Sequence, residues 1–215
     1  MKNRLFVTVL FLVASATFYA QEYKLGVKAG PNLSNVSGYL SETTNPRLGY
    51  HFGFFSEISF TDKFSVNPEL YYNSIGYVFE FSENNRNVFN PEQQDLYFKT
   101  AQRLNYLTVP ITLKFYINQK FSLEAGPQTS FLINAVSKLK EASDMNGVEN
   151  RYSSSGDFRL DFGATLGIGY NLTDRTMLQL RYYYGLRNLF ENNPADFKSY
   201  NQAIQLSVGY TFLKD

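Results

Sequence analysis

Cysteine and tryptophan are absent from the 215-residue chain, and histidine occurs only once. Without cysteine there is no disulfide framework, no thiolate ligand for a metal and no lipidated N-terminal cysteine. A metal would have to be held by carboxylates with at most one histidine, which is a poor ligand set for zinc. We therefore predict no metal and no cofactor, and we expect the fold to be stabilised by its own hydrogen bonds and packing.

Long apolar segments are missing except at the start of the chain. The segment from Leu5 to Phe18 follows a basic beginning and is interrupted only by three hydroxyl-bearing residues, which predicts a signal peptide. Cleavage after Ala16 would satisfy the small-x-small rule, whereas cleavage after Ala20 would place Phe18 three residues before the bond. No later segment approaches the roughly 18–20 apolar residues of a membrane helix, so an exported chain is either secreted or inserted as strands.

An excess of charge of one sign is also missing. The chain has 20 basic and 19 acidic residues with no block of like charge. Loss of Lys2 and Arg4 with the signal peptide would leave 18 basic residues and a net charge of about −1. Nucleic-acid binding therefore has no electrostatic basis, and we predict no nucleic-acid partner.

The chain has, instead, long alternations of apolar and polar residues. From Phe158 to Tyr170 thirteen positions alternate without a break, which separates an apolar face from a polar face in an extended chain. An ordinary strand has roughly 5–6 residues, whereas a tilted strand across a membrane needs about 9–11. The alternation recurs about eight times and predicts strands near 23–35, 48–60, 64–78, 102–117, 121–134, 158–170, 176–186 and 202–212.

The connections between these segments alternate in length. Three short ones, rich in turn residues, lie at 61–63, 118–120 and 171–175, and the longer ones lie near 36–47, 79–101, 135–157 and 187–200. Short turns at one end and long loops at the other are typical of outer-membrane barrels, with the short turns in the periplasm. An even number of antiparallel strands can also close without unpaired edges. We predict an all-β fold, an eight-stranded antiparallel up-and-down transmembrane β-barrel surrounded by the lipids of a bacterial outer membrane.

Four short motifs make the chain resemble a known family. They are the Ala20-Gln21 junction, the opening KLGVKAGPN at 24–32, the YLTVPI strand at 106–111 and the closing VGYTF at 208–212. With these motifs the chain resembles the porin-like, PorT-like outer-membrane β-barrel proteins of the Bacteroidetes over essentially all of its mature length. The resemblance favours a signal peptide at 1–20 and a barrel domain at 21–215. It also implies a possible role as a transport or protein-secretion accessory with a periplasmic or membrane partner.

Charged residues recur on the polar faces of the predicted strands. The interior of an eight-stranded barrel is filled by side chains, and buried charges persist only when they are paired. We therefore predict an ion-pair network that sets the strand register and closes the lumen, and the alternative is a narrow gated path or a small polar site. The residues concerned are Lys24, Lys28, Glu57, Glu69, Lys114, Glu124, Arg159, Asp161 and Arg181.

His51 is the single histidine and also falls on a polar face. A hydrolytic site would pair it with a serine or a carboxylate, and Ser59, Glu57 and Glu69 are the candidates nearby. A hydrogen-bonded side chain that fills the lumen is the simpler interpretation. We therefore predict that the protein is not an enzyme.

Aromatic residues recur in the long segment 79–101. Phe79, Phe81, Phe89, Tyr97 and Phe98 either extend a strand pair beyond the membrane, which we favour, or form an exposed surface for a partner or ligand. We predict a structural or surface-interaction role, with a possible protein partner on the long loops. A secreted lipocalin-like barrel, which would turn the apolar faces inward around a ligand, is the other alternative.

Overall fold

The computed structural model describes residues 22–83, 96–142, 151–155, 160–189 and 197–215. Within these residues no helix has the length and apolar character needed to cross a membrane. Nine strands and one short 3-10 helix are present in the described chain. Their bounds are β1 (Glu22–Gly38), η2 (Tyr39–Glu42), β2 (Thr44–Ser59), β3 (Phe64–Glu83), β4 (Leu96–Tyr116), β5 (Phe121–Ala142), β6 (Arg151–Ser155), β7 (Leu160–Asn171), β8 (Thr176–Gly185) and β9 (Ser199–Lys214).

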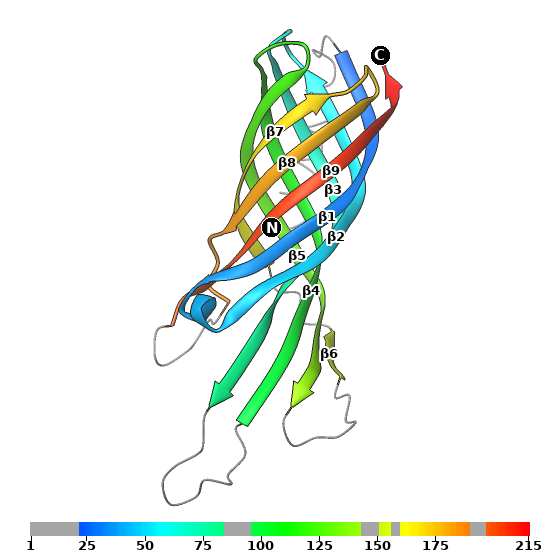
Figure 1. Cartoon of the computed structure of the whole chain (residues 1–215). Coiled ribbons are helices and arrows are strands. Elements are labelled where there is room, and N and C mark those ends of the chain that lie inside the picture. Colours follow the sequence, from blue (N-terminus) through cyan, green and yellow to red (C-terminus); the bar gives the residue numbers. More distant parts are fainter. Residues whose placement is uncertain (1–21, 84–95, 143–150, 156–159, 190–196) are drawn as a thin grey trace, which may run out of the picture.

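Eight of these strands close into a ring. The order is β4, β3, β2, β1, β9, β8, β7 and β5, and a further pairing of β5 with β4 completes the circle. All of the pairings are antiparallel. The strands tilt strongly around the long axis of the molecule (Figure 1). The predicted eight-stranded antiparallel barrel is therefore confirmed.

The two faces of the barrel wall have opposite character. Large apolar side chains point outward and are exposed, such as Leu48 at 71%, while the buried side chains are mostly polar or charged. This is the reverse of a water-soluble protein, in which apolar side chains fill the interior. The lipocalin-like alternative is therefore wrong, because its ligand-binding interior would need the apolar face that here lies outside.

Side-chain oxygens close the three short turns in the same way. Thr61 Oγ1 accepts a hydrogen bond from the Phe64 amide (3.1 Å), Asn118 Oδ1 from the Phe121 amide (2.8 Å), and Thr173 Oγ1 from the amide of residue 176 (3.0 Å). Such bonds let a short polar side chain replace a backbone acceptor in a tight turn. We call this end of the barrel the turn end and the opposite one the loop end.

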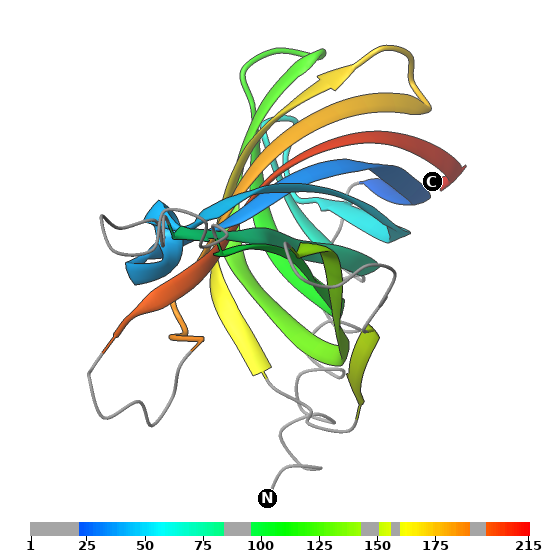
Figure 2. The same cartoon turned by 60° about the horizontal axis from the view of Figure 1, so that its bottom comes forward.

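Three strands continue well past the ring at the loop end. β3, β4 and β5 have 20, 21 and 22 residues, and β6 pairs with the outer part of β5. Together they form a sheet that projects from the barrel (Figures 1 and 2). In the described residues, much of the two longer connections predicted near 79–101 and 135–157 is strand. β6 was not predicted, because its sequence RYSSS carries no alternation.

Aromatic side chains cross-link the projecting sheet. Phe98 lies opposite Phe81 in the strand register, with ring centroids 5.3 Å apart, and 5.7 Å from the ring of Phe79. These residues and Tyr97 belong to β3 and β4, which confirms that the aromatic residues extend a strand pair. Phe89 lies outside the described residues.

Candidate functional site

Arg181 lies in the middle of the lumen and binds two glutamates, Glu69 and Glu124, whose strands β3 and β5 both neighbour β4. It projects from β8 and is only 1% exposed. Its Nη1 and Nη2 donate to the two carboxylate oxygens of Glu69 on β3 at 2.7 and 2.6 Å. Its Nε and Nη2 donate to Glu124 on β5, the second bond being 3.1 Å long. The planar guanidinium therefore forms a two-point contact with each carboxylate, the geometry in which arginine binds carboxylates most strongly.

Lys28 and Gln179 complete this central cluster. The Lys28 Nζ lies 2.5 Å from Glu69 Oε2 and donates to Gln179 Oε1 at 3.1 Å. The amide of Gln179 in turn donates to Glu124 Oε2 at 3.0 Å. Two cations and two anions thus balance, and every ionised group has partners, as buried charge requires.

A second cluster lies nearer the turn end, around Glu57. Its Oε2 accepts a hydrogen bond from Lys114 Nζ at 2.6 Å, and its Oε1 accepts from the Tyr116 hydroxyl at 2.6 Å and from Lys24 Nζ at 3.3 Å. Lys24 also lies 3.8 Å from Glu22 and is 19% exposed at the mouth. The two clusters therefore fill the lumen from its centre to the opening at the turn end.

A glycine makes room for the central cluster. Gly167 on β7 is paired with Glu124 on one side and Arg181 on the other. A Cβ atom at this position would lie 2.6 Å from Glu124 Oε1 and 2.8 Å from Arg181 Cγ. The ion pair therefore forms across a strand position without a side chain, which explains a glycine on the polar face of β7.

Seven of the nine predicted lumen residues lie in these two clusters. Asp161 is buried but separate from both, and its Oδ2 accepts a hydrogen bond from Asn201 Nδ2 at 2.8 Å. Arg159 lies outside the described residues. Sequence alternation identified the inner face of the eight described residues, but it did not identify Gln179, Tyr116 or Asn201 as their partners.

His51 does not pair with any of its predicted partners. Its Nε2 lies 2.7 Å from the hydroxyl of Ser207 on β9, and its ring packs at 59° to Tyr71, with centroids 5.8 Å apart. The side chain is 1% exposed. The structure therefore brings His51 to Ser207 rather than to Ser59, Glu57 or Glu69, and it buries the imidazole.

An apolar cluster occupies the lumen toward the loop end. Ile75, Tyr106, Leu132 and Ala203 are buried together, with Leu104 and Ala135 packed against them. The pairing of β4 with β5 shifts register between Asn105 and Tyr106, next to this cluster. Sequence alternation missed it, because the pattern by itself assigns apolar residues to the lipid face.

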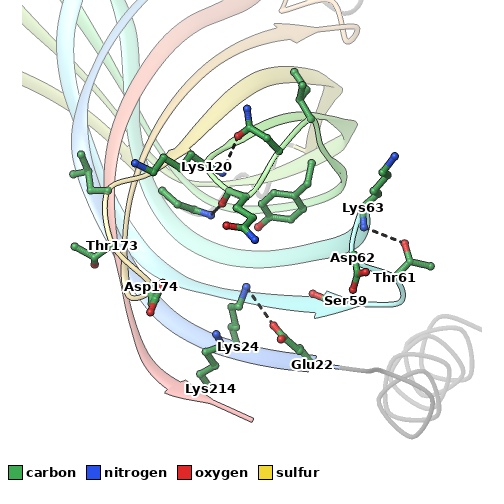
Figure 3. A pocket seen from close by; sticks show the side chains of 16 residues that line it. Glu22, Lys24, Ser59, Thr61, Asp62, Lys63, Lys120, Thr173, Asp174 and Lys214 are labelled. Atoms are coloured by element: carbon green, nitrogen blue, oxygen red, sulfur yellow. Dashed lines mark hydrogen bonds and ion pairs between the residues drawn. The ribbon is translucent and has the colours of Figure 1, made fainter.

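The turn end opens into a cavity of about 820 Å³. Figure 3 shows charged side chains of both signs around it, from the strand ends and from the three short turns. Tyr116 also lines the cavity, so its floor adjoins the Glu57 cluster. The described residues contain no group of three or more histidine, aspartate or glutamate side chains that could hold a metal.

An apolar outer wall, a charged interior and a closed ring of strands define a transmembrane β-barrel. Residues 19–191 match the model of a family described as outer membrane protein beta-barrel domain, and the chain belongs to this family. It is therefore a bacterial outer-membrane protein, surrounded by lipid, with its short turns in the periplasm. No curated protein sequence matches the chain.

Solved structures of other barrels are similar to this chain at low sequence identity. Ail, the attachment invasion locus protein of Yersinia pestis, is 14% identical with a TM-score of 0.48, and the match covers 89% of this chain and 98% of Ail. Neisserial surface protein A is 13% identical with a TM-score of 0.49, covering 87% and 97% of the two chains. The outer membrane protease OmpT of Escherichia coli is 10% identical with a TM-score of 0.46, covering 90% and 97%.

Proposed function

We propose that the protein is a non-enzymatic surface-interaction barrel, in which a closed lumen anchors an extracellular sheet that binds a protein partner. The sheet formed by β3, β4, β5 and β6 is the observation that carries this proposal. It extends beyond the lipid-facing part of the barrel, where it meets the surroundings of the cell.

The contents of the lumen argue against a solute channel. Arg181 and its partners fill the centre, the Glu57 cluster lies toward the periplasm, and the apolar cluster around Ile75 lies toward the outside. A path for solutes would have to break ion pairs at two levels and displace packed apolar side chains at a third. We expect planar-bilayer recordings of the purified barrel to give no stable steps, and a steady ohmic conductance would contradict closure.

The projecting sheet has two features suited to a partner. β6 is the last strand in the sheet order, so its outer edge has no described strand partner and can accept another strand. Phe81 and Phe98 are exposed on one face of the same sheet and pack against each other at an interplanar angle of 31°. The edge of β6 offers hydrogen bonds, and the aromatic pair, on β3 and β4 across β5 from that edge, offers apolar contact on the same sheet.

Photo-crosslinking in living cells tests this proposal. A photoreactive phenylalanine analogue replaces Phe98 on the projecting sheet or, as a matched control, Phe121, an exposed lipid-facing aromatic residue at the periplasmic end. We expect a discrete protein adduct from position 98 and none from position 121. If position 98 gave no adduct, or if both positions gave the same adduct, the proposal of a protein partner on the sheet would be contradicted.

The PorT-like resemblance supports a second candidate, an accessory of transport or protein secretion in the Bacteroidetes. The cavity of about 820 Å³ favours it, because this cavity faces the periplasm and presents charged groups such as Lys63 and Asp174. The same analogue at Asp62 separates the two candidates. A periplasmic protein trapped at position 62, with nothing at position 98, would favour the secretion role.

A further inference from the structure

Two arginines lie next to each other on the outer wall of the barrel. Arg47 belongs to an irregular stretch of β2, where the pairing with β3 shifts register between Pro46 and Tyr50. Arg103 lies on β4, directly opposite Gly76 of β3. Because Gly76 has no side chain, nothing on the intervening strand separates the two. Their guanidinium groups are close enough to interact electrostatically.

Neither arginine contacts a carboxylate in the described chain. Arg47 donates to the backbone oxygens of Ser74 and Ile75 at 3.4 and 3.3 Å and to the Ser74 hydroxyl at 3.5 Å. These bonds are long, and bonds of this length are weak. Arg103 is exposed and has no hydrogen bond or ion pair to the described residues. Two like charges held side by side without a counterion repel each other, and an anion between them would relieve the repulsion.

The pair lies where the lipid-facing band of this wall ends. Tyr50, Phe52 and Tyr72 pack into an outward aromatic cluster with centroid separations of 5.4 to 6.4 Å. Aromatic residues of this kind mark the membrane–water interface of barrels. Tyr50 lies opposite Ser74, whose carbonyl accepts a hydrogen bond from Arg47, so the Arg47 guanidinium lies next to this aromatic cluster.

Apolar surface for acyl chains adjoins the two arginines. Leu48, in the same irregular stretch as Arg47, is highly exposed, and so is Phe52 below it. A molecule with a phosphate at the headgroup level and acyl chains below it would meet positive charge and apolar surface together. A free inorganic anion would use only the arginines. The continuity of the two surfaces therefore favours a lipid.

We propose that Arg47 and Arg103 form a binding site for the phosphorylated headgroup of an outer-leaflet lipid. Each guanidinium presents several N–H donors in a fixed plane that matches phosphate oxygens. Lys138 is exposed on the same face, since Ala101 opposite it is two residues from Arg103, and it extends the positive surface outward.

Lipid binding to the purified full-length barrel in detergent tests the site. Diphosphorylated lipid A, its dephosphorylated form and inorganic phosphate are titrated separately and followed by native mass spectrometry. The variant is Arg47→Gln/Arg103→Gln, and the matched control is Lys63→Gln/Lys120→Gln, which removes the same charge from the periplasmic turns. Retention of the mobility shift on unboiled gels verifies that each variant is folded.

We expect the arginine variant to bind diphosphorylated lipid A roughly 25-fold more weakly, at about 5-fold per charge, and the lysine control to bind it normally. The dephosphorylated lipid should bind both variants and the wild type equally. An equal loss of affinity for diphosphorylated lipid A in the two variants would show that only the net charge matters, and it would overturn the proposed site. Inorganic phosphate that competes at the affinity of lipid A would show an anion site without a lipid, which would also overturn the proposal.

Discussion

Arg181 holds two buried carboxylates together, so its removal tests whether the ion-pair cluster stabilises the barrel. In Arg181→Met, Glu69 keeps Lys28 at 2.5 Å and the Asn67 amide at 2.6 Å. Glu124 keeps only the Gln179 amide at 3.0 Å. Nearly all the penalty should therefore come from Glu124, which loses its ion-pair partner and keeps only the more distant charges of Lys28 and of Lys114, the residue opposite it on β4.

The expected magnitude follows from the cost of breaking a buried ion pair. Removing one partner of such a pair destabilises a protein by about 3–5 kcal/mol. Arg181→Met should fall in this range. The double variant Arg181→Met/Glu124→Gln removes both charges and should recover at least about 2 kcal/mol of the loss, because replacing a whole buried pair is often nearly neutral.

Urea unfolding of the barrel in lipid vesicles measures these free energies. The chain lacks tryptophan, so the folded fraction is best read from the mobility shift on unboiled gels. Lys120→Gln on an exposed turn is the control and should stay within about 0.5 kcal/mol of the wild type. A loss below about 1 kcal/mol in Arg181→Met, or a double variant as unstable as the single one, would refute this account of the cluster.

Three further predictions concern the lumen and the N-terminus. Gly167→Val should lower the free energy of unfolding by about 1–3 kcal/mol, because the valine side chain would collide with Glu124 and Arg181. Ala164→Val on the lipid face should leave the free energy of unfolding nearly unchanged in the same urea titration. His51→Phe should lower the free energy of unfolding by about 1–3 kcal/mol, because it leaves the Ser207 hydroxyl without its partner. If the wild type hydrolyses an ester or peptide substrate and this variant does not, the protein is an enzyme and the non-enzymatic assignment is contradicted. Mass spectrometry of the mature protein should find Gln21 as the first residue, and a start at Thr17 would place cleavage after Ala16.

Local pattern was enough to predict the barrel. Alternation over ten or more residues assigns each side chain to a face, because successive side chains in a strand point to opposite sides. It placed Glu57, Glu69, Glu124 and Arg181 on the inner face, where the structure has them. The turn residues also set the turn ends of the strands, since Thr61, Asn118 and Thr173 act within their own turns.

The register between strands could not be predicted from the alternation of apolar and polar residues. Which lysine meets which glutamate depends on the stagger between strands and on contacts across the lumen, such as Arg181 with Glu69, 112 residues apart in the chain. The register shifts near Arg47 and Tyr106 change which side chains come into contact, and no local sequence pattern predicts these shifts. For the same reason the sequence suggested Ser59 as a partner for His51, whereas closure of the barrel places Ser207 of β9 next to the imidazole.

The sequence by itself determined the class of this protein: a chain without cysteine, with no long apolar segment after residue 18 and with eight two-faced segments separated by alternating short and long connections. These are local properties that each strand and turn carries alone. Only the tertiary structure decided the two ion-pair clusters, the apolar cluster, the projecting sheet with β6 and the pairing of Arg47 with Arg103. Each of these depends on residues from strands distant in the chain, which are brought together only when the sheet closes with a particular stagger.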